Sequence, residues 1–183
     1  MDFIFIHGAP GSGKSSLAWA LQARLQSPCF EFGWIPEFRQ RRNSSISYTE
    51  EELLAFDNLC LVLRNYVRHG FDRILVTDLR DPIFLQVPRR FSRYHYLIVT
   101  LCVQDDQILK ARVLDESRSS GYRDWQEALS LNQEICRRKL RKHEVRLDSG
   151  QYAIPELVDQ VMGMLDAAAQ GAFPPDRRKT KQG

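Results

Sequence analysis

Residues 3–21 read FIFIHGAPGSGKSSLAWAL, and this stretch decides the fold. Its first five residues, FIFIH, are β-branched or aromatic and predict a short buried strand. From Ser15 onward the pattern changes, because Leu17, Leu21 and Leu25 recur at helical spacing. A glycine-rich segment therefore joins a strand directly to a helix.

That segment, Gly8 to Ser15, matches the pattern G-x-x-x-x-G-K-[ST] at every fixed position. Glycines let successive backbone N–H groups point inward around a polyphosphate, and the following helix presents its positive N-terminus to the same anion. We expect Lys14 to reach the β- and γ-phosphates, and the Ser15 hydroxyl to ligate Mg²⁺. The predicted nucleotide site comprises Gly8, Ala9, Pro10, Gly11, Ser12, Gly13, Lys14, Ser15 and Ser16.

The GAPGSGKS stretch resembles the phosphate-binding loop of the small kinases of nucleosides, nucleotides and metabolites, and that of adenylate kinases in particular. The wider layout is similar as well, with five strands, a long helical excursion after the second and an arginine-bearing segment after the fourth. The resemblance covers about residues 1–170. It implies a three-layer P-loop fold with a small lid, and an ATP-dependent kinase activity.

Apolar runs predict the other strands, near residues 29–32, 73–78, 94–103 and 144–149. Helices are predicted between them, including one opened by a Thr49–Glu52 capping box and one reaching about Arg141. Near-continuous apolar runs are typical of parallel strands buried on both faces. We expect one α/β domain over residues 1–170, with a five-stranded parallel sheet between helices, and a disordered basic tail over 171–183.

The composition argues for an ordinary globular protein. The net charge is +3 over 183 residues, too mild to indicate nucleic acid or membrane binding. Four cysteines lie far apart without a CxxC pair, so we expect reduced thiols. No apolar run approaches the ~20 residues of a membrane span, and we see no signal peptide. We expect a cytoplasmic monomer or homodimer.

Asp78 ends the predicted strand at 73–78, next to the strand of the loop. Its carboxylate would face Mg²⁺ through water, although it could instead cap the following turn. Asp81, which precedes Pro82, is a competitor for which a turn role is favoured. The DLR stretch is similar to an acidic–arginine motif of deoxynucleoside kinases, which implies that Arg80 binds substrate or phosphate; a solvated surface arginine is the alternative.

The stretch GWIPEFRQRR follows the second predicted strand, where the resembling kinases build their acceptor site. Phosphoryl transfer to a hydroxyl benefits from a carboxylate that accepts its proton, and Glu37 is the first candidate, with Glu31 second. Arg39 and its neighbours could hold an anionic acceptor, or could form a solvated basic face. Trp34 and Phe38 could stack on a ring, or could belong to the core.

Residues 112–124 form the predicted lid, in the polar segment after the fourth strand. The resemblance implies that lid arginines neutralise charge in the transition state and that lid closure excludes water. Arg118 and Arg123 are the candidates, whereas Arg112 could form an ion pair within its own helix. An exposed loop is the alternative.

The sequence therefore predicts a Mg²⁺-dependent ATP phosphotransferase with a small-molecule acceptor, such as a nucleoside, nucleotide or metabolite. It lacks the NKxD motif of GTPases and the DGFPR stretch of adenylate kinases, so the acceptor stays open, as does ATP against GTP. Two alternatives remain. One is an ATP-binding regulatory protein without phosphotransfer, and the other is a polynucleotide 5′-hydroxyl kinase that uses the basic residues 39–42.

Overall fold

A computed structural model describes residues 1–34, 47–117 and 120–171 of the chain. Its centre is a five-stranded sheet in the order β2-β3-β1-β4-β5, with every neighbouring pair parallel. The strands are β1 (Phe3–Gly8), β2 (Cys29–Glu31), β3 (Ile74–Thr77), β4 (Tyr96–Cys102) and β5 (Glu144–Asp148). The β3 strand pairs with β1, so the expected neighbour of the loop strand is confirmed.

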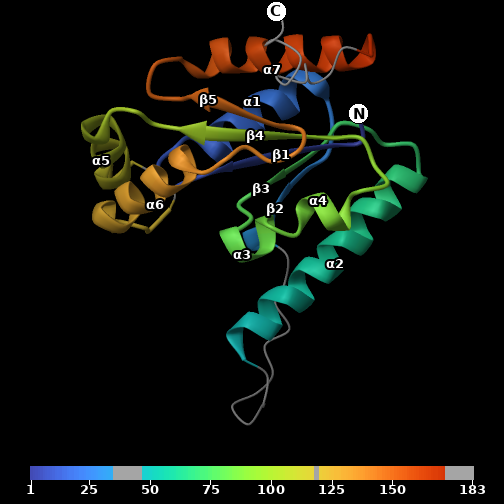
Figure 1. Ribbon diagram of the computed structural model, residues 1–183, viewed down its shortest axis with the longest axis horizontal. Coiled ribbons are helices and arrows are strands. Elements are labelled where there is room, and N and C mark those ends of the chain that lie inside the picture. Colours follow the sequence, from blue (N-terminus) through green and yellow to red (C-terminus); the bar gives the residue numbers. More distant parts are fainter. Residues whose placement is uncertain (35–46, 118–119, 172–183) are drawn as a thin grey trace, which may run out of the picture.

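Helices cover both faces of this sheet (Figure 1). On one face, α1 (Lys14–Leu25) and α7 (Ile154–Ala169) pack on Ile4 and Ile6 of β1. On the other, α2 (Tyr48–Arg68), α3 (Asp81–Phe84) and α4 (Val87–Arg90) pack on Phe3 and Phe5. Successive residues of a strand point to opposite faces, and an apolar strand therefore needs a helical layer on each side. The predicted three-layer α/β fold class is confirmed.

Two further helices, α5 (Asp106–Leu114) and α6 (Trp125–Arg137), follow the carboxyl end of β4. They pack on each other through Val103, Leu109, Val113 and Ala128. The segment between them is the predicted lid. Helix α6 ends four residues before the predicted Arg141, because Arg138 takes an extended conformation and starts the turn into β5.

The predicted capping box of α2 is wrong by two residues. Ser47 is the N-cap, its hydroxyl accepts the Glu50 N–H, and the Glu50 carboxylate accepts the Ser47 N–H at 2.7 Å. The S-x-x-E and T-x-x-E patterns overlap here, and the sequence pattern alone could not choose between them. The glutamate of the second pattern, Glu52, is buried instead.

Candidate active site

The loop after β1 takes backbone conformations that glycine adopts most readily. Gly8, Gly11 and Gly13 have φ angles of 149°, 83° and 90°. A Cβ atom at Gly8 would lie 2.7 Å from the Leu101 carbonyl oxygen, and one at Gly11 would lie 2.8 Å from a Val113 methyl group. Glycine is thus required here both by backbone conformation and by close packing on β4 and α5.

The loop ends at the N-terminus of α1, whose N-cap is Gly13 and which therefore has no side-chain cap. The first N–H groups of a helix point outward and attract anions. Lys14 Nζ lies 3.2 Å from the Ala9 carbonyl oxygen, so its ammonium group lies across the loop. On the far side, the Ser149 hydroxyl donates to the Ser12 carbonyl at 2.7 Å and fixes the loop to the residue after β5.

Two carboxylates stand beside this loop, where β2 and β3 end. Asp78 directly follows β3 with a left-handed φ of 65°. A Cβ atom at Gly33 would lie 3.6 Å from Asp78 Oδ2, so Asp78 points toward the segment that follows Glu31. In the part of the chain that the structure describes, neither carboxylate has a hydrogen-bond or ion-pair partner. No described residue therefore occupies the oxygens of Glu31 or Asp78.

The pKa of Glu31 is raised above its ordinary value by the groups around it. Burial raises this pKa, the negative charge of Asp78 raises it further, and the positive charge of Lys14 opposes both. Since charges act on one another mainly at short range, Glu31 lies near both Asp78 and Lys14, at the carboxyl edge of the sheet. The Ser15 hydroxyl, in the first turn of α1, adds a hard oxygen donor of the type that Mg²⁺ prefers. The residues present therefore fit a magnesium polyphosphate.

Arg80 and Asp81 are held by protein groups. The Arg80 guanidinium donates to the Tyr48 hydroxyl at 2.6 Å and lies 3.5 Å from the Glu52 carboxylate, both on α2. Asp81 begins α3, as its predicted turn role suggests, and its carboxylate lies 3.1 Å from Nε2 of His7. Contact with His7 lowers the Asp81 pKa.

The two described arginines of the predicted lid, Arg112 and Arg123, differ in their position relative to the loop. Arg123 donates to the carbonyl oxygens of Ser120 and Tyr122, at 2.5 and 2.9 Å, within its own segment. Arg112 donates to the Ser149 carbonyl at 2.8 Å, and so reaches the residue that also bonds Ser12. The arrangement brings Arg112 next to the loop, and does not bring Arg123 there.

Several predicted residues lie outside the described residues. Among them are the first candidate base, Glu37, and the lid residue Arg118. The predicted acceptor-binding residues of the same stretch also lie there: Phe38, Arg39, Arg41 and Arg42. Glu31, the second candidate base, is the described carboxylate that faces Lys14.

His7 was not singled out by the sequence, where it reads as the last residue of an apolar strand. It is buried, its ring stacks on Phe84 with centroids 3.8 Å apart, and burial lowers its pKa. The His7 imidazole thus lies directly before the loop, with Nε2 3.1 Å from the Asp81 carboxylate. Strand alternation could have placed it on the face of α3, but nothing in the pattern named its partner.

The expectation of reduced thiols is wrong for two cysteines. Cys102, at the end of β4, and Cys136, in the last turn of α6, form a disulfide across 34 residues, with Cα atoms 5.8 Å apart. Cys29 and Cys60 are free thiols, as expected. Spacing along the chain could not reveal that the end of β4 packs on α6.

No helix in the described ranges is both long and apolar enough to cross a membrane. No family model matches the chain, and no curated protein matches it.

Solved structures do match, at low identity. A gluconokinase from Sinorhizobium meliloti matches with a TM-score of 0.64 and 16% identity, over 94% of this chain and 95% of that one. A shikimate kinase from Aquifex aeolicus matches with 0.56 and 16%, over 92% and 99%. A thymidylate kinase from Candida albicans matches with 0.58 and 15%, over 92% of each. The chain has the fold of the small P-loop kinases, as the resemblance of its loop implied.

Proposed function

We propose that this protein is a Mg²⁺-dependent ATP phosphotransferase acting on a small-molecule acceptor. Residues 1–170 form its kinase domain, with residues 112–124 as the lid. The observation that carries the proposal is the pairing of a complete phosphate-binding loop with two carboxylates, Glu31 and Asp78, that have no hydrogen-bond or ion-pair partner among the described residues, with the charges of Asp78 and Lys14 both acting on Glu31. Binding of a nucleotide alone would require the loop but not a second carboxylate beside Asp78.

The chemistry divides among these groups. The loop N–H groups and Lys14 bind the β- and γ-phosphates, and Ser15 and Asp78 hold Mg²⁺ beside them. The metal supplies neutralisation of phosphate charge. Glu31 orients the acceptor hydroxyl and accepts its proton as the oxygen bonds to the γ-phosphorus and ADP leaves. The raised pKa of Glu31 suits this role, since a more basic carboxylate accepts a proton more readily.

Other residues complete the site. Glu37 is the alternative base, and Arg39 and Arg80 are proposed contacts of an anionic acceptor. Arg118 and Arg123 are proposed to act when the lid closes, because exclusion of water prevents hydrolysis from competing with transfer. In the described arrangement Arg123 binds its own segment, so its action requires lid movement.

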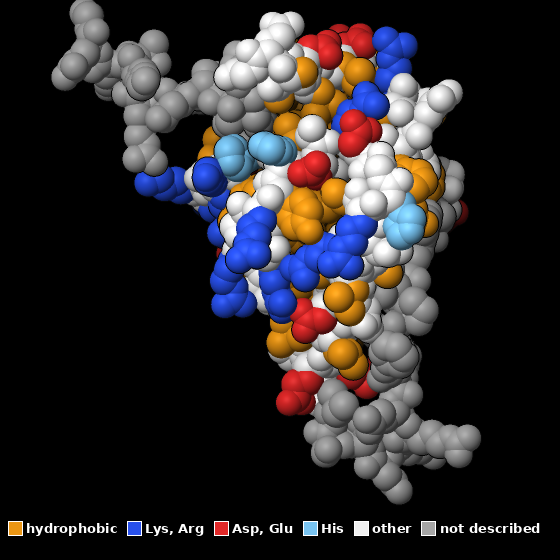
Figure 2. All heavy atoms as spheres, turned by 90° about the vertical axis from the view of Figure 1, so that its right-hand side faces the viewer, with side chains coloured by type: hydrophobic (Ala, Val, Ile, Leu, Met, Phe, Trp, Pro, Cys, Tyr) orange, Lys and Arg blue, Asp and Glu red, His pale blue; other side chains and the backbone are white. Residues whose placement is uncertain are grey.

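One basic surface of the described residues lies away from the phosphate-binding loop, whereas residues 39–42, on which the polynucleotide alternative depends, lie outside the described residues. Lys and Arg side chains gather on the face that Figure 2 turns to the viewer, where α4 and the C-terminal end of α2 lie. These helices carry Arg64, Arg68, Arg89 and Arg90. This face lies at the opposite edge of the sheet from the phosphate-binding loop, so a strand bound there would not lead to Lys14.

The test is ADP formation from ATP or GTP over a panel of acceptors. The named activities of the structural neighbours suggest sugars, sugar acids, shikimate-like hydroxy acids and nucleoside monophosphates. The proposal predicts turnover with one acceptor class, lost in Lys14→Ala. A short oligonucleotide with a 5′-hydroxyl belongs in the panel as the polynucleotide alternative. Tight ATP binding without turnover for any acceptor would favour the regulatory alternative and overturn the proposal.

A further inference from the structure

The disulfide lies at the junction of two functional segments. Cys102 is the last residue of β4 and is fully buried, and its neighbours in the core are Ala9 of the phosphate-binding loop and Ile135 of α6. Its carbonyl accepts the Ser149 N–H at 2.8 Å. Cys136 belongs to α6, the helix that follows the lid, and is only partly buried. The disulfide therefore links the end of β4, which packs on Ala9 of the phosphate-binding loop, to α6, the helix that follows the predicted lid.

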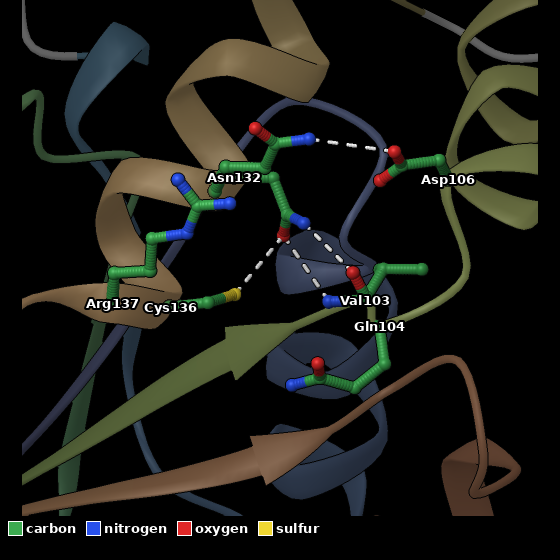
Figure 3. Close-up of a pocket in the computed structure, with 7 residues that line it drawn as sticks. Val103, Gln104, Asp106, Asn132, Cys136 and Arg137 are labelled. Carbon is green, nitrogen blue, oxygen red and sulfur yellow. Dashed lines mark hydrogen bonds between the residues drawn. The ribbon is translucent and has the colours of Figure 1, made fainter.

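A cavity of about 280 Å³ opens beside this bond (Figure 3). It lies between the start of α5 and the face of α6, and of the two bridged cysteines Cys136 is the one in its wall. Polar side chains form most of the rest: Gln104, Asp106, Asn132, Gln133 and Arg137. A reagent from solvent thus meets the Cys136 sulfur, with Cys102 behind it.

Besides the disulfide, a pair of hydrogen bonds joins α6 to the chain after β4. The Asn132 amide donates to the Val103 carbonyl at 2.7 Å and accepts the Val103 N–H at 3.1 Å, which ties α6 to the chain after β4. The same Asn132 oxygen lies 3.6 Å from the Cys136 sulfur (Figure 3). If the disulfide opens, this tie keeps Cys136 at the cavity wall near Arg137, whose positive charge attracts the anionic thiolate of a reagent.

We propose that Cys136 is a site of thiol–disulfide exchange with a small peptide thiol of the glutathione class. The thiolate of the reagent attacks Cys136 Sγ, a new sulfur–sulfur bond forms there, and the bond to Cys102 breaks. Cys102 leaves as a thiolate and takes a proton from solvent. A second thiolate then removes the first as a symmetric disulfide and leaves Cys136 as a thiol. Two reagent thiols are oxidised, and one protein disulfide is reduced.

The other cysteines are poor competitors. Burial is the main cause that raises the pKa of Cys29 and of Cys60 to about 11, which leaves both as unreactive thiols near neutral pH. Polar donors such as Gln104 and Arg137 in the cavity suit the carboxylates and amides of a peptide thiol. Exchange at Cys136 is therefore selective by position and by chemistry.

The experiment uses the full chain purified without reductant and treated with a mixture of reduced and oxidised glutathione. Intact mass and peptide mapping then locate the adduct. We expect a single glutathionyl group on the Cys136 peptide, in larger yield in Cys102→Ser, where no second sulfur competes. Adducts mainly on Cys102, Cys29 or Cys60, or no adduct while Cys102 and Cys136 are found as unreacted thiols, would overturn the proposal.

A charge variant tests the cavity itself. Arg137→Gln is expected to slow glutathionylation of the Cys102→Ser protein several-fold at neutral pH. Lys139→Gln is the matched control, because Lys139 is an exposed cation two residues on and does not line the cavity. Equal rates in the two variants would show that the cavity does not select the reagent, and far-ultraviolet circular dichroism would confirm that both variants fold.

Discussion

Two glutamates at the two sides of the sheet have opposite surroundings. Glu144, at the start of β5, has a fully buried side chain that accepts hydrogen bonds from Arg138 at 2.6 and 2.8 Å, from the Arg141 N–H at 2.8 Å and from the Thr100 hydroxyl. Glu31, at the end of β2, is half-buried and has no such partner in the residues that the structure describes. One carboxylate is saturated and the other is open.

The two pKa values move in opposite directions for this reason. Burial opposes ionisation of Glu144, but its hydrogen bonds with Arg138, Thr100 and the Arg141 N–H outweigh burial and lower its pKa. Burial and Asp78 raise the pKa of Glu31. The β4–β5 side of the loop strand thus holds a carboxylate saturated with hydrogen bonds, whereas on the β2–β3 side, among the described residues, Glu31 has none, as the proposed ligand site requires.

The largest effect is expected on the β4–β5 side. Glu144→Ala leaves Arg138 buried without its anion, and should lower the free energy of unfolding by about 4 kcal/mol. Urea unfolding monitored by circular dichroism measures it. Glu134→Ala, an exposed residue of α6, is the control and should change stability by less than about 0.5 kcal/mol. Similar losses of unfolding free energy in Glu144→Ala and Glu134→Ala would show that the hydrogen bonds of Glu144 do not stabilise the β4–β5 side.

At Glu31 a substitution is expected to reduce activity and not stability. Glu31→Gln should lower kcat about 100-fold or more, because the acceptor proton loses its base, with little change in ATP affinity. Steady-state kinetics with the acceptor found in the panel measure it, with Glu134→Gln as the control. A kcat close to that of the wild type would assign the base to another residue, such as Glu37.

The change in the free energy of unfolding at Glu31 should have the opposite sign to that expected for Glu144→Ala. A carboxyl whose pKa is raised on folding binds more protons in the folded state, so wild-type stability falls as pH rises through the window from its ordinary to its raised pKa. Glu31→Gln should remove that fall and be as stable as the wild type, or more so, at neutral pH. A loss of stability like that of Glu144→Ala would contradict an open, unsatisfied carboxylate.

Reduction of the disulfide is the next effect in size. Opening a link across 34 residues should lower the free energy of unfolding by about 3 kcal/mol and the Tm by about 8 °C. Thermal unfolding with and without a phosphine reductant measures it. Cys102→Ser should be insensitive to the reductant, and a wild-type Tm that ignores reductant would contradict the cross-link.

The smallest effect on stability is expected at Arg80. Its side chain is 66% exposed, so Arg80→Ala should cost about 1 kcal/mol through the lost contacts with Tyr48 and Glu52. If Arg80 also binds an anionic acceptor, the KM of that acceptor should rise about tenfold. An unchanged KM would show that Arg80 contacts only Tyr48 and Glu52 of α2. It would remove Arg80 from the proposed acceptor-binding residues.

The sequence predicted those features that local pattern determines. The loop after β1 and the five strands follow from glycine spacing and from apolar runs, and Asp78 was placed by its position after one of them. The helices α3 and α4 were missed because each is only four residues long and begins at a proline-containing turn. Short helices carry no periodic signal.

Contacts between distant residues could not be predicted. His7 on β1 meets Asp81, which follows the neighbouring strand β3, and Cys102 at the end of β4 meets Cys136 on α6. The choice between Glu37 and Glu31 as the base stays a prediction, because Glu37 lies outside the described residues. Such contacts depend on how the helices and strands pack together, and a local sequence pattern does not identify the partner residue.

The most direct test follows the γ-phosphate itself. ATP labelled at the γ-phosphate is incubated with the wild type, Lys14→Ala and Glu31→Gln, together with the acceptor that stimulates ADP formation, and the labelled products are separated. The account predicts label in an organic phosphate ester for the wild type and almost none for either variant. Label released only as inorganic phosphate by the wild type, whatever the acceptor, would contradict a phosphotransfer site at the carboxyl edge of this sheet.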